Sequence, residues 1–434
     1  MQMDDMILIS VDDHIVEPPD LFTRHMPAKY RERAPRVIDH KGKDVWFFED
    51  KVVPFPGLGS VAGRPPEEYG MEPVRFSQMR DGCYLRDARV GDMNANGMLA
   101  ALCFPTWTDF AGTNYAKASD KELALATIQT YNDWHVDELA GGQPGRFIPL
   151  CVVPLWDVGL AVREVERLAA KNVHAITFPD NPAAKGLPSI HSGYWDPLFQ
   201  VCQEARVVLC AHIGTGLGVP IPSDDAPQSS WIVNLPLSIA FAASDWTFSQ
   251  VFVKFPKLKF ALSEGGIGWV PYFLERADFT YNHHKAWTRQ NMGGRLPSEI
   301  FRENVITCFI DDKFGVESRH KLGVESICWE CDYPHSDSTW PRSPEILWET
   351  MKDVPKAEVD LMTHLNAMRE FSFDPFSVLR REDCTVGALR AQAKAKGIDT
   401  RPVPGRGGIK AAVDDTRVVT CGDVQRQLQE ASTA

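Results

Sequence analysis

The segment MILISVDDH (residues 6–14) contains the first apolar run of the chain and leads directly into ionisable residues. This run is rich in Ile, Leu and Val and lacks a strict alternation of polar and apolar residues, which is typical of a strand buried on both faces of a parallel sheet. Seven further runs of the same kind follow, at 99–105, 147–155, 174–179, 207–214, 258–264, 304–310 and 326–332. We therefore predict eight buried parallel strands.

Amphipathic segments separate these runs. Residues 122–140, 160–171 and 269–284 place apolar residues three and four positions apart, which predicts helices. Eight strands alternating with helices predict an α/β protein with a (β/α)₈ TIM barrel. A doubly wound open sheet is the alternative. It is disfavoured because the first strand leads into DDHIVEPPD rather than a glycine-rich turn.

The barrel is expected to occupy residues 1–382, with two long insertions at about 18–85 and 215–257. Both insertions would lie among the βα loops at the C-terminal face, where we expect them to form a lid or substrate cover. From about residue 383 the chain becomes polar and includes the Pro-Gly-rich patch PVPGRGG at 402–408. We interpret 383–434 as a C-terminal extension, either an oligomer arm or a partly disordered segment.

The composition excludes some classes of partner. A formal net charge of −12 disfavours binding to nucleic acid. No apolar run reaches the length of a membrane span, and the N-terminus carries two acids where a secretory signal would carry bases. The ten cysteines are scattered, mostly within apolar runs, as is typical of reduced, buried thiols. We expect a cytoplasmic protein without a nucleic-acid or membrane partner.

Ionisable residues stand at the carboxyl ends of four of the predicted strands. Asp12 and His14 are two positions apart, so they share one face of the first strand. His212 ends the fifth strand, Glu264 the sixth and Asp332 the eighth. A lone histidine is more often a core residue, but convergence of four strand ends indicates a site. The sequence therefore predicts a divalent metal held by Asp12, His14, His212 and Asp332.

At these residues the chain resembles the amidohydrolase superfamily, in particular the branch that includes aminocarboxymuconate-semialdehyde decarboxylase and γ-resorcylate decarboxylase. The resemblance covers residues 6 to 373. It rests on VDDHIVEPPDLF, DMNANGMLAALCFPT, YNDWHVDE, YWDPLFQVCQEARVVLCAHIG, SEGGIGWVPYFLERAD, CDYPHSDSTWP and, near residue 366, NAMREF. These motifs are specific for the family and only weakly specific for a reaction.

The resemblance implies roles for individual residues. The first-strand motif of the family falls on Asp12 and His14, and its fifth-strand histidine on His212. Its final aspartate, which contacts the metal and positions or deprotonates a water, falls on Asp332. Glu264 departs from the pattern because the family commonly has a histidine there. No lysine ends the fourth strand, so a bridging carboxylated lysine is not expected.

The resulting ligand set combines two histidines with as many as three carboxylates. It implies zinc first, with manganese or iron as alternatives, and a second ion is possible if Glu264 reaches the metal. A cap for the helix start after Gly265 is an equally weighted role for Glu264. We assign Asp332, Glu264 and His335 as catalytic. For His335, a hydrogen bond to a ligand is the slightly favoured alternative.

We predict a metal-dependent hydrolase or carboxy-lyase that hydrolyses or non-oxidatively decarboxylates a small organic substrate, namely a carboxylate, an aromatic compound, an amide or an ester. One alternative is a non-haem iron, possibly diiron, monooxygenase. Another is a catalytically inactive barrel used for binding. The resemblance also makes a homo-oligomer plausible. The roles of Glu17 and Glu330 stay open, Asp13 is interpreted as structural, and Cys328 and Cys331 as buried structural thiols.

Overall fold

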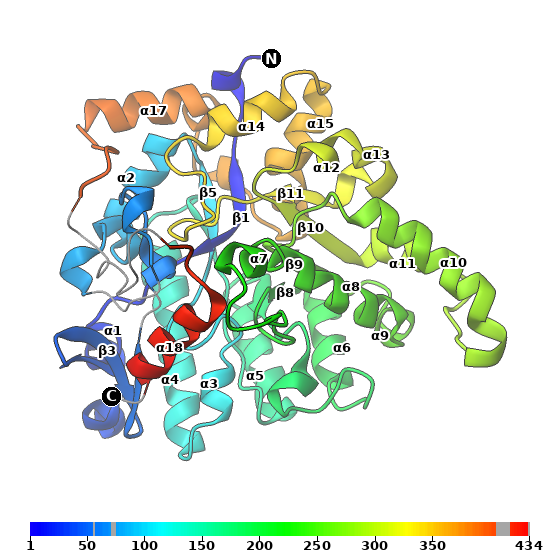
Figure 1. Ribbon diagram of the computed structural model, residues 1–434, viewed down its shortest axis with the longest axis horizontal. Coiled ribbons are helices and arrows are strands. Elements are labelled where there is room, and N and C mark those ends of the chain that lie inside the picture. Colours follow the sequence, from blue (N-terminus) through cyan, green and yellow to red (C-terminus); the bar gives the residue numbers. More distant parts are fainter. Residues whose placement is uncertain (55–56, 71–74, 405–416, 433–434) are drawn as a thin grey trace.

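Eight short parallel strands surround the centre of the molecule (Figure 1). The structure, a computed structural model, describes residues 1–54, 57–70, 75–404 and 417–432. The barrel strands are β1 (Ile9–His14), β5 (Ala100–Phe104), β6 (Phe147–Ile148), β7 (Ala175–Thr177), β8 (Val208–His212), β9 (Phe260–Ser263), β10 (Val305–Phe309) and β11 (Ile327–Trp329). Each lies within one of the eight predicted runs, and all of their side chains are buried, as expected for strands covered on both faces.

The strands close into a ring. They form a three-stranded sheet in the order β1-β5-β6 and a five-stranded sheet in the order β11-β10-β9-β8-β7. A parallel bridge between Cys151 and Ile176 joins β6 to β7. On the other side, the Asp332 amide donates to the Asp12 carbonyl (2.8 Å) and the His14 amide to the Tyr333 carbonyl (2.7 Å). These bonds join β11 to β1, so the predicted (β/α)₈ barrel is confirmed.

Helices follow the strands and cover the outside of the barrel (Figure 1). The predicted helix at 122–140 is α4 (Lys121–Asp133) with a π-helical continuation at Trp134–Ala140, and the one at 160–171 is α5 (Val158–Ala169). The one at 269–284 is part of α10 (Val270–Thr288). The other barrel helices are α2 (Arg86–Asn96), α6 (Asp196–Ala205), α8 (Ile239–Phe248), α11 (Pro297–Asn304), α14 (Ser343–Met351), α15 (Lys356–Asp360) and α16 (Asn366–Glu370), with shorter α3 (Thr113–Ala116), α9 (Val251–Lys254), α12 (Lys313–Glu317) and α13 (Arg319–Leu322).

The first insertion contains structure that the sequence did not indicate. After α1 (Leu21–His25), the strands β2 (Arg36–His40), β3 (Lys43–Phe48) and β4 (Lys51–Pro54) form an antiparallel sheet. Further along, the amides of Val61 and Ala62 both donate to the Pro334 carbonyl, just after β11. The insertion therefore reaches the mouth of the barrel.

The second insertion is shorter than predicted. Residues 215–257 contain not only α7 (Gln228–Ile232) but also α8, whose buried face includes Ile239, Ala243 and Trp246. The indole of Trp246 stacks on Phe260 of β9, with ring centroids 4.0 Å apart. Helix α8 is thus the barrel helix between β8 and β9, and the insertion proper ends near residue 238. The sequence did not indicate α8 as a separate helix because a long polar segment precedes its apolar residues.

The C-terminal extension runs along the outside of the barrel. Helix α17 (Val386–Ala395) lies beside α2, and the Val386 amide donates to the Met6 carbonyl (2.8 Å). Helix α18 (Cys421–Ser432) lies near α7, where the Gln228 amide donates to the Val419 carbonyl (2.9 Å). Residues 405–416, which include the end of the Pro-Gly-rich patch, lie outside the described residues, so the expectation of a partly disordered segment stays a prediction there. The parts on either side dock on the chain itself.

The cysteines and the helix lengths bear on the expected compartment of the protein. All ten cysteines are buried and unpaired, Cys328 and Cys331 among them. Within the described ranges, no helix combines the length and apolar character that crossing a membrane requires.

Arg89 of α2 ties the first strand to the first insertion. Its guanidinium is fully buried and donates to the carbonyls of Gly82 (2.7 Å) and His14. It also lies 3.6 Å from the carboxylate of Asp13 and 4.2 Å from the ring centroid of Tyr333. Removing the guanidinium would leave the Asp13 carboxylate buried without its cation.

We therefore expect Arg89→Met to lower the free energy of unfolding by about 3–5 kcal/mol, as when one partner of a buried ion pair is removed. Urea denaturation followed by circular dichroism measures this. The control is Arg86→Met on the same helix, which removes a half-buried guanidinium paired with Asp87 and should cost about 1 kcal/mol or less. Equal losses in the two variants would contradict this role of Arg89.

Candidate metal centre

The predicted site residues converge at the carboxyl ends of the barrel strands. Asp12 and His14 come from β1, His212 ends β8, Glu264 follows β9, and Asp332 and His335 follow β11. Glu264 and Asp332 both adopt left-handed backbone conformations, each with a φ of 59°. Such a φ is uncommon for residues other than glycine and tends to occur at functional sites. The site thus brings together all six residues that the sequence singled out.

Their donor atoms point at a common centre. His14 Nε2 lies 3.1 Å from His212 Nε2, 3.5 Å from Asp12 Oδ1 and 3.4 Å from Asp332 Oδ1. His212 Nε2 lies 3.5 Å from Asp12 Oδ2 and 3.0 Å from Glu264 Oε2. Ligands that each bind one ion at about 2.1 Å are separated by roughly 3–3.4 Å. The spacing of this cluster therefore fits a single bound cation.

Unsatisfied oxygens provide a second test of the fit. Both carboxylate oxygens of Asp12 and both of Asp332 are buried, and none of the four makes a well-aligned hydrogen bond with a described residue, although His335 Nδ1 lies 3.0 Å from Asp332 Oδ1. Buried polar atoms are almost always paired, and an uncompensated buried carboxylate is costly. A cation at the centre would balance the negative charge of these carboxylates. Two overlapping groups have ligand spacing, namely Asp12, His14, His212 and Glu264, and His14, Glu264, Asp332 and His335.

The pKa shifts of the site residues also indicate that this site lacks a compensating positive charge. Burial raises the pKa of Asp12 and of Asp332 well above the usual range, and repulsion from Glu264 adds to both shifts. Burial lowers the pKa of His14, helped by repulsion from His335 and His212. For Glu264, burial favours the neutral acid, but the hydrogen bond and charge of His212 outweigh it and lower the pKa. A bound cation reverses the shifts that favour neutral acids.

The orientation of the imidazoles is set by their neighbours. His212 Nδ1 lies 2.8 Å from the Ile213 carbonyl, so with Nδ1 protonated the neutral ring presents the Nε2 lone pair to the centre. The ring of His14 is held by stacking on His335, with centroids 3.6 Å apart. His335 in turn places Nδ1 3.0 Å from Asp332 Oδ1, and burial lowers its pKa to about 4. His335 is therefore neutral near pH 7.

Residues whose roles the sequence left open lie around this centre. Glu330 is fully buried and accepts a hydrogen bond from the Glu264 amide (3.2 Å), and it forms no ion pair with a residue of the described ranges. Burial raises its pKa well above the usual range. Asp13 lies on the other side of β1, where the Ser10 hydroxyl donates to it (2.8 Å). Glu17 accepts from the amides of Thr106 and Trp107 and so fixes the loop after β5.

Phe110 is a site residue that sequence reasoning missed. Its ring centroid lies 4.3 Å from that of His212 and 4.6 Å from that of His14. Trp107, three residues earlier in the same loop, instead stacks on Trp46 of the first insertion, with ring centroids 5.3 Å apart. The loop after β5 carries both aromatic residues, and nothing in their sequence positions distinguishes the one that reaches the site.

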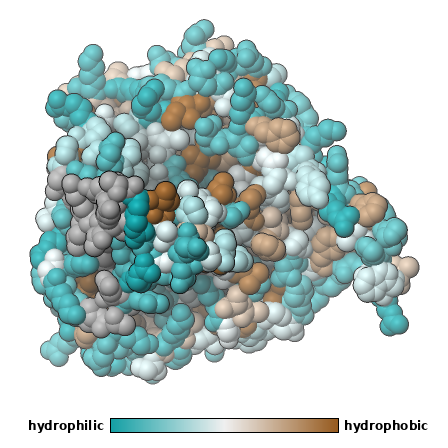
Figure 2. Space-filling model, in the orientation of Figure 1, coloured by the Kyte–Doolittle hydropathy of each residue, from teal (hydrophilic) through white to brown (hydrophobic). Residues whose placement is uncertain are grey.

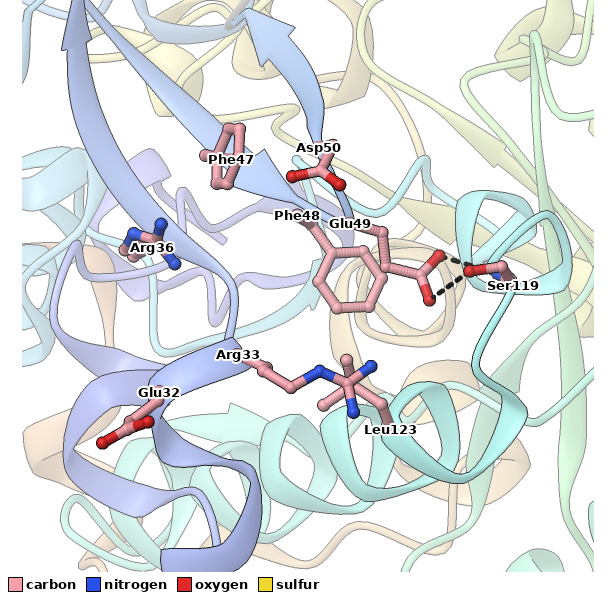
Figure 3. Close-up of a pocket in the computed structure, with 9 residues that line it drawn as sticks. All are labelled: Glu32, Arg33, Arg36, Phe47, Phe48, Glu49, Asp50, Ser119 and Leu123. Atoms are coloured by element: carbon pink, nitrogen blue, oxygen red, sulfur yellow. Dashed lines mark hydrogen bonds between the residues drawn. The ribbon is translucent and has the colours of Figure 1, made fainter.

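Two cavities of the protein are candidate places for a ligand. A cavity of about 660 Å³ adjoins the metal centre and is lined by Glu264 and Glu330. Another, of about 310 Å³, lies between the first insertion and the start of α4 (Figure 3). There, Glu49 already accepts hydrogen bonds from Ser119 and Asp120, and Arg33 pairs with Asp120. This second cavity contains none of the site residues, so we place the chemistry in the first.

Comparison with known proteins agrees with this geometry. A γ-resorcylate decarboxylase from Polaromonas sp. (strain JS666 / ATCC BAA-500) is 26% identical over 270 residues, which are 58% of this chain and 77% of that protein. An amidohydrolase from Mycobacterium avium subsp. paratuberculosis K-10 superposes with a TM-score of 0.63 at 22% identity, covering 84% of this chain and 99% of that one.

A dihydroxybenzoic acid decarboxylase from Polaromonas sp. JS666, solved with manganese and the inhibitor 2-nitroresorcinol, has a TM-score of 0.53 at 18% identity, covering 84% of this chain and 96% of that one. The family described as amidohydrolase matches residues 47–373. That match begins after β1, so the structure adds Asp12 and His14 to the matched part of the barrel. Because it spans most of the sequence, the chain belongs to the amidohydrolase family.

Proposed function

We propose that this protein is a metal-dependent carboxy-lyase that removes the carboxyl group of an aromatic carboxylate without an oxidant. The observation that carries the proposal is the buried cluster of Asp12, His14, His212 and Asp332. The named activity of the γ-resorcylate decarboxylase relative supports the choice of reaction.

We further propose that Asp12, His14, His212 and Asp332 hold one divalent ion, with Glu264 as an additional ligand. The carboxylate-rich set suits manganese as well as zinc. Manganese in a structural neighbour favours manganese over our first expectation of zinc. When bound, the ion would supply positive charge that attracts substrate oxygens and stabilises the negative charge of the transition state.

The protein residues then have to supply a proton. In decarboxylation, the ring carbon that bears the carboxylate gains a proton, the carbon–carbon bond breaks, and its electron pair stays in the ring as CO₂ leaves. Asp332 and His335 lie 3.0 Å apart and can share this proton. Asp332 donates to the ring carbon and is reprotonated through His335, whose side chain is 12% exposed and so reaches solvent.

Hydrolysis is the second candidate function, and one observation favours it. Glu264 replaces the histidine that is common in the family, and its carboxylate lies 3.0 Å from His212. A carboxylate at this position can accept a proton from an attacking water, as can Asp332. The substrate would then be an ester or amide instead of a ring carboxylate.

Asp332→Asn is expected to lower the rate of decarboxylation by roughly 10²–10⁴-fold, because it removes the proton-transfer group. The measurement is CO₂ release from 2,6-dihydroxybenzoate and related ring carboxylates with manganese present. Asp353→Asn changes an exposed aspartate elsewhere and should keep the wild-type rate. Wild-type turnover of esters or amides, with no CO₂ from any ring carboxylate, would replace the proposal with the hydrolytic one.

We also propose that the protein is a cytosolic homo-oligomer. Buried, unpaired cysteines support a reducing compartment.

Helix α10 protrudes from the barrel (Figures 1 and 2) and exposes 73% of Tyr272, 53% of Phe279 and 73% of Trp287. These residues are seven and eight positions apart, so they share one helix face. Exposed apolar surface of this kind marks a contact with another protein, here a second copy.

Light scattering after size exclusion should therefore give at least twice the mass of one chain. The double variant F279E/W287E should elute with the mass of a single chain, because it places charges in the contact. Val378→Glu, at another exposed apolar residue (58%), should leave the mass unchanged. A wild-type monomer, or an oligomer that survives F279E/W287E, would rule out this contact.

A further inference from the structure

The cavity beside the metal centre has an unusual charge. Fourteen residues line it, and five of them are acids while none is lysine, arginine or histidine. The acids come from three loops at the barrel mouth: Glu264 after β9, Asp311 and Asp312 after β10, and Glu330 and Asp337 around the end of β11. We call this space the acidic cavity.

The acids of the acidic cavity differ in whether they already have partners. Asp312 accepts hydrogen bonds from the amides of Ile267, Gly268 and Gly315, so it is committed to holding loops. In contrast, Asp311 and Asp337 form no salt bridge with any residue of the described ranges. Each has a hydrogen bond with one hydroxyl, Asp311 with Thr350 and Asp337 with Ser336. An ionised carboxylate has about four lone-pair sites, so both keep acceptor capacity for a ligand.

Glu330 provides an independent sign that a ligand group belongs here. Its side chain is fully buried and lines the acidic cavity. Oε2 accepts from the Glu264 amide, but no nitrogen or oxygen donor of the described residues reaches Oε1, and the thiol of Cys308 beside the carboxyl is only a weak donor. Buried carboxyl oxygens without a partner are rare in folded proteins. A donor group of a ligand would satisfy this atom.

Apart from Thr339, the remaining walls of the acidic cavity consist of apolar side chains and glycines. Trp269 lines it; its indole nitrogen donates to the Gly265 carbonyl (2.9 Å), and its ring packs edge-on against Phe273, with centroids 5.4 Å apart. Val233 and Leu237 from the second insertion line the opposite part and are 67% and 47% exposed. Figure 2 shows apolar surface over α7 and the start of α8. An aromatic ring beside carboxylates attracts organic cations and disfavours anions.

We propose that the substrate joins its reacting carboxylate to a flat apolar body that carries a positively charged amine, and that the amine occupies the acidic cavity near Asp311 and Asp337. The position of the reacting carboxylate rests on the proposed function, whereas the amine site does not. Substrates with a second carboxylate at this end would be repelled by the same residues. A second metal ion held by the two aspartates is the competing occupant.

Simple probes test the amine site apart from catalysis. Binding of benzylamine, which is cationic, and benzyl alcohol, which is neutral and of similar size, is measured by ligand-observed NMR titration of the manganese-loaded full chain. Benzylamine should bind about tenfold more tightly, as two partly exposed ion pairs allow. The preference should shrink to less than twofold in D311N/D337N. It should persist in E166Q/E204Q, which neutralises two exposed acids on α5 and α6.

Equal binding of the two probes to the wild type, or an unchanged preference in D311N/D337N, would overturn the amine site. Displacement of benzylamine by excess magnesium would overturn it in favour of a second metal ion. Turnover is scored separately with ring carboxylates that carry or lack an aminomethyl group. A benzylamine preference without any CO₂ release would sink the proposed function and leave the amine site standing. CO₂ release together with equal binding of the two probes would overturn the amine site and leave the proposed function standing.

Discussion

The carboxylates of Asp12 and Asp332 lie side by side in the barrel mouth, fully buried, and their four oxygens make no well-aligned hydrogen bond in the described part of the chain. Two negative groups in this environment repel each other and lose their hydration. Only a cation, or protonation, can compensate them. The surrounding structure supplies the rest of a coordination sphere, since His14 and His212 direct Nε2 to the same point.

The barrel itself holds this arrangement in register. The backbone bond between the Asp332 amide and the Asp12 carbonyl closes the ring and also fixes the two carboxylates relative to each other. Arg89 supports the end of β1 from behind through the His14 carbonyl, and the left-handed backbone at Asp332 turns its side chain toward the centre. Fold and site therefore depend on the same contacts, and damage to the closure of the barrel would also damage the metal centre.

Much of this was predictable because the signals are periodic or local. Buried parallel strands require apolar runs, and parallel strands end at one face, so ionisable residues that follow such runs had to meet there. This argument located Asp12, His14, His212, Glu264 and Asp332 without the structure. The family resemblance assigned a role to each of these residues, and membership of the family was confirmed.

Features that depend on loop conformation were not predictable. The sheet β2–β4 in the first insertion and the barrel helix α8 were both missed because polar loop sequence surrounds them. Phe110, which packs on both metal-site imidazoles, lies in the same loop as Trp107, and only the folded path separates their roles. The acidic cavity gathers residues from three loops, so no single segment of the sequence displays it.

Elemental analysis of the purified protein tests the central claim most directly. Wild type, His212→Ala and Glu264→Gln should be compared after confirming by circular dichroism that each is folded. The account predicts about one manganese or zinc ion per wild-type chain, nearly complete loss in His212→Ala, and roughly 10–100-fold weaker retention in Glu264→Gln. A wild-type protein that binds no divalent metal even after reconstitution, or equal metal content in folded His212→Ala, would contradict it.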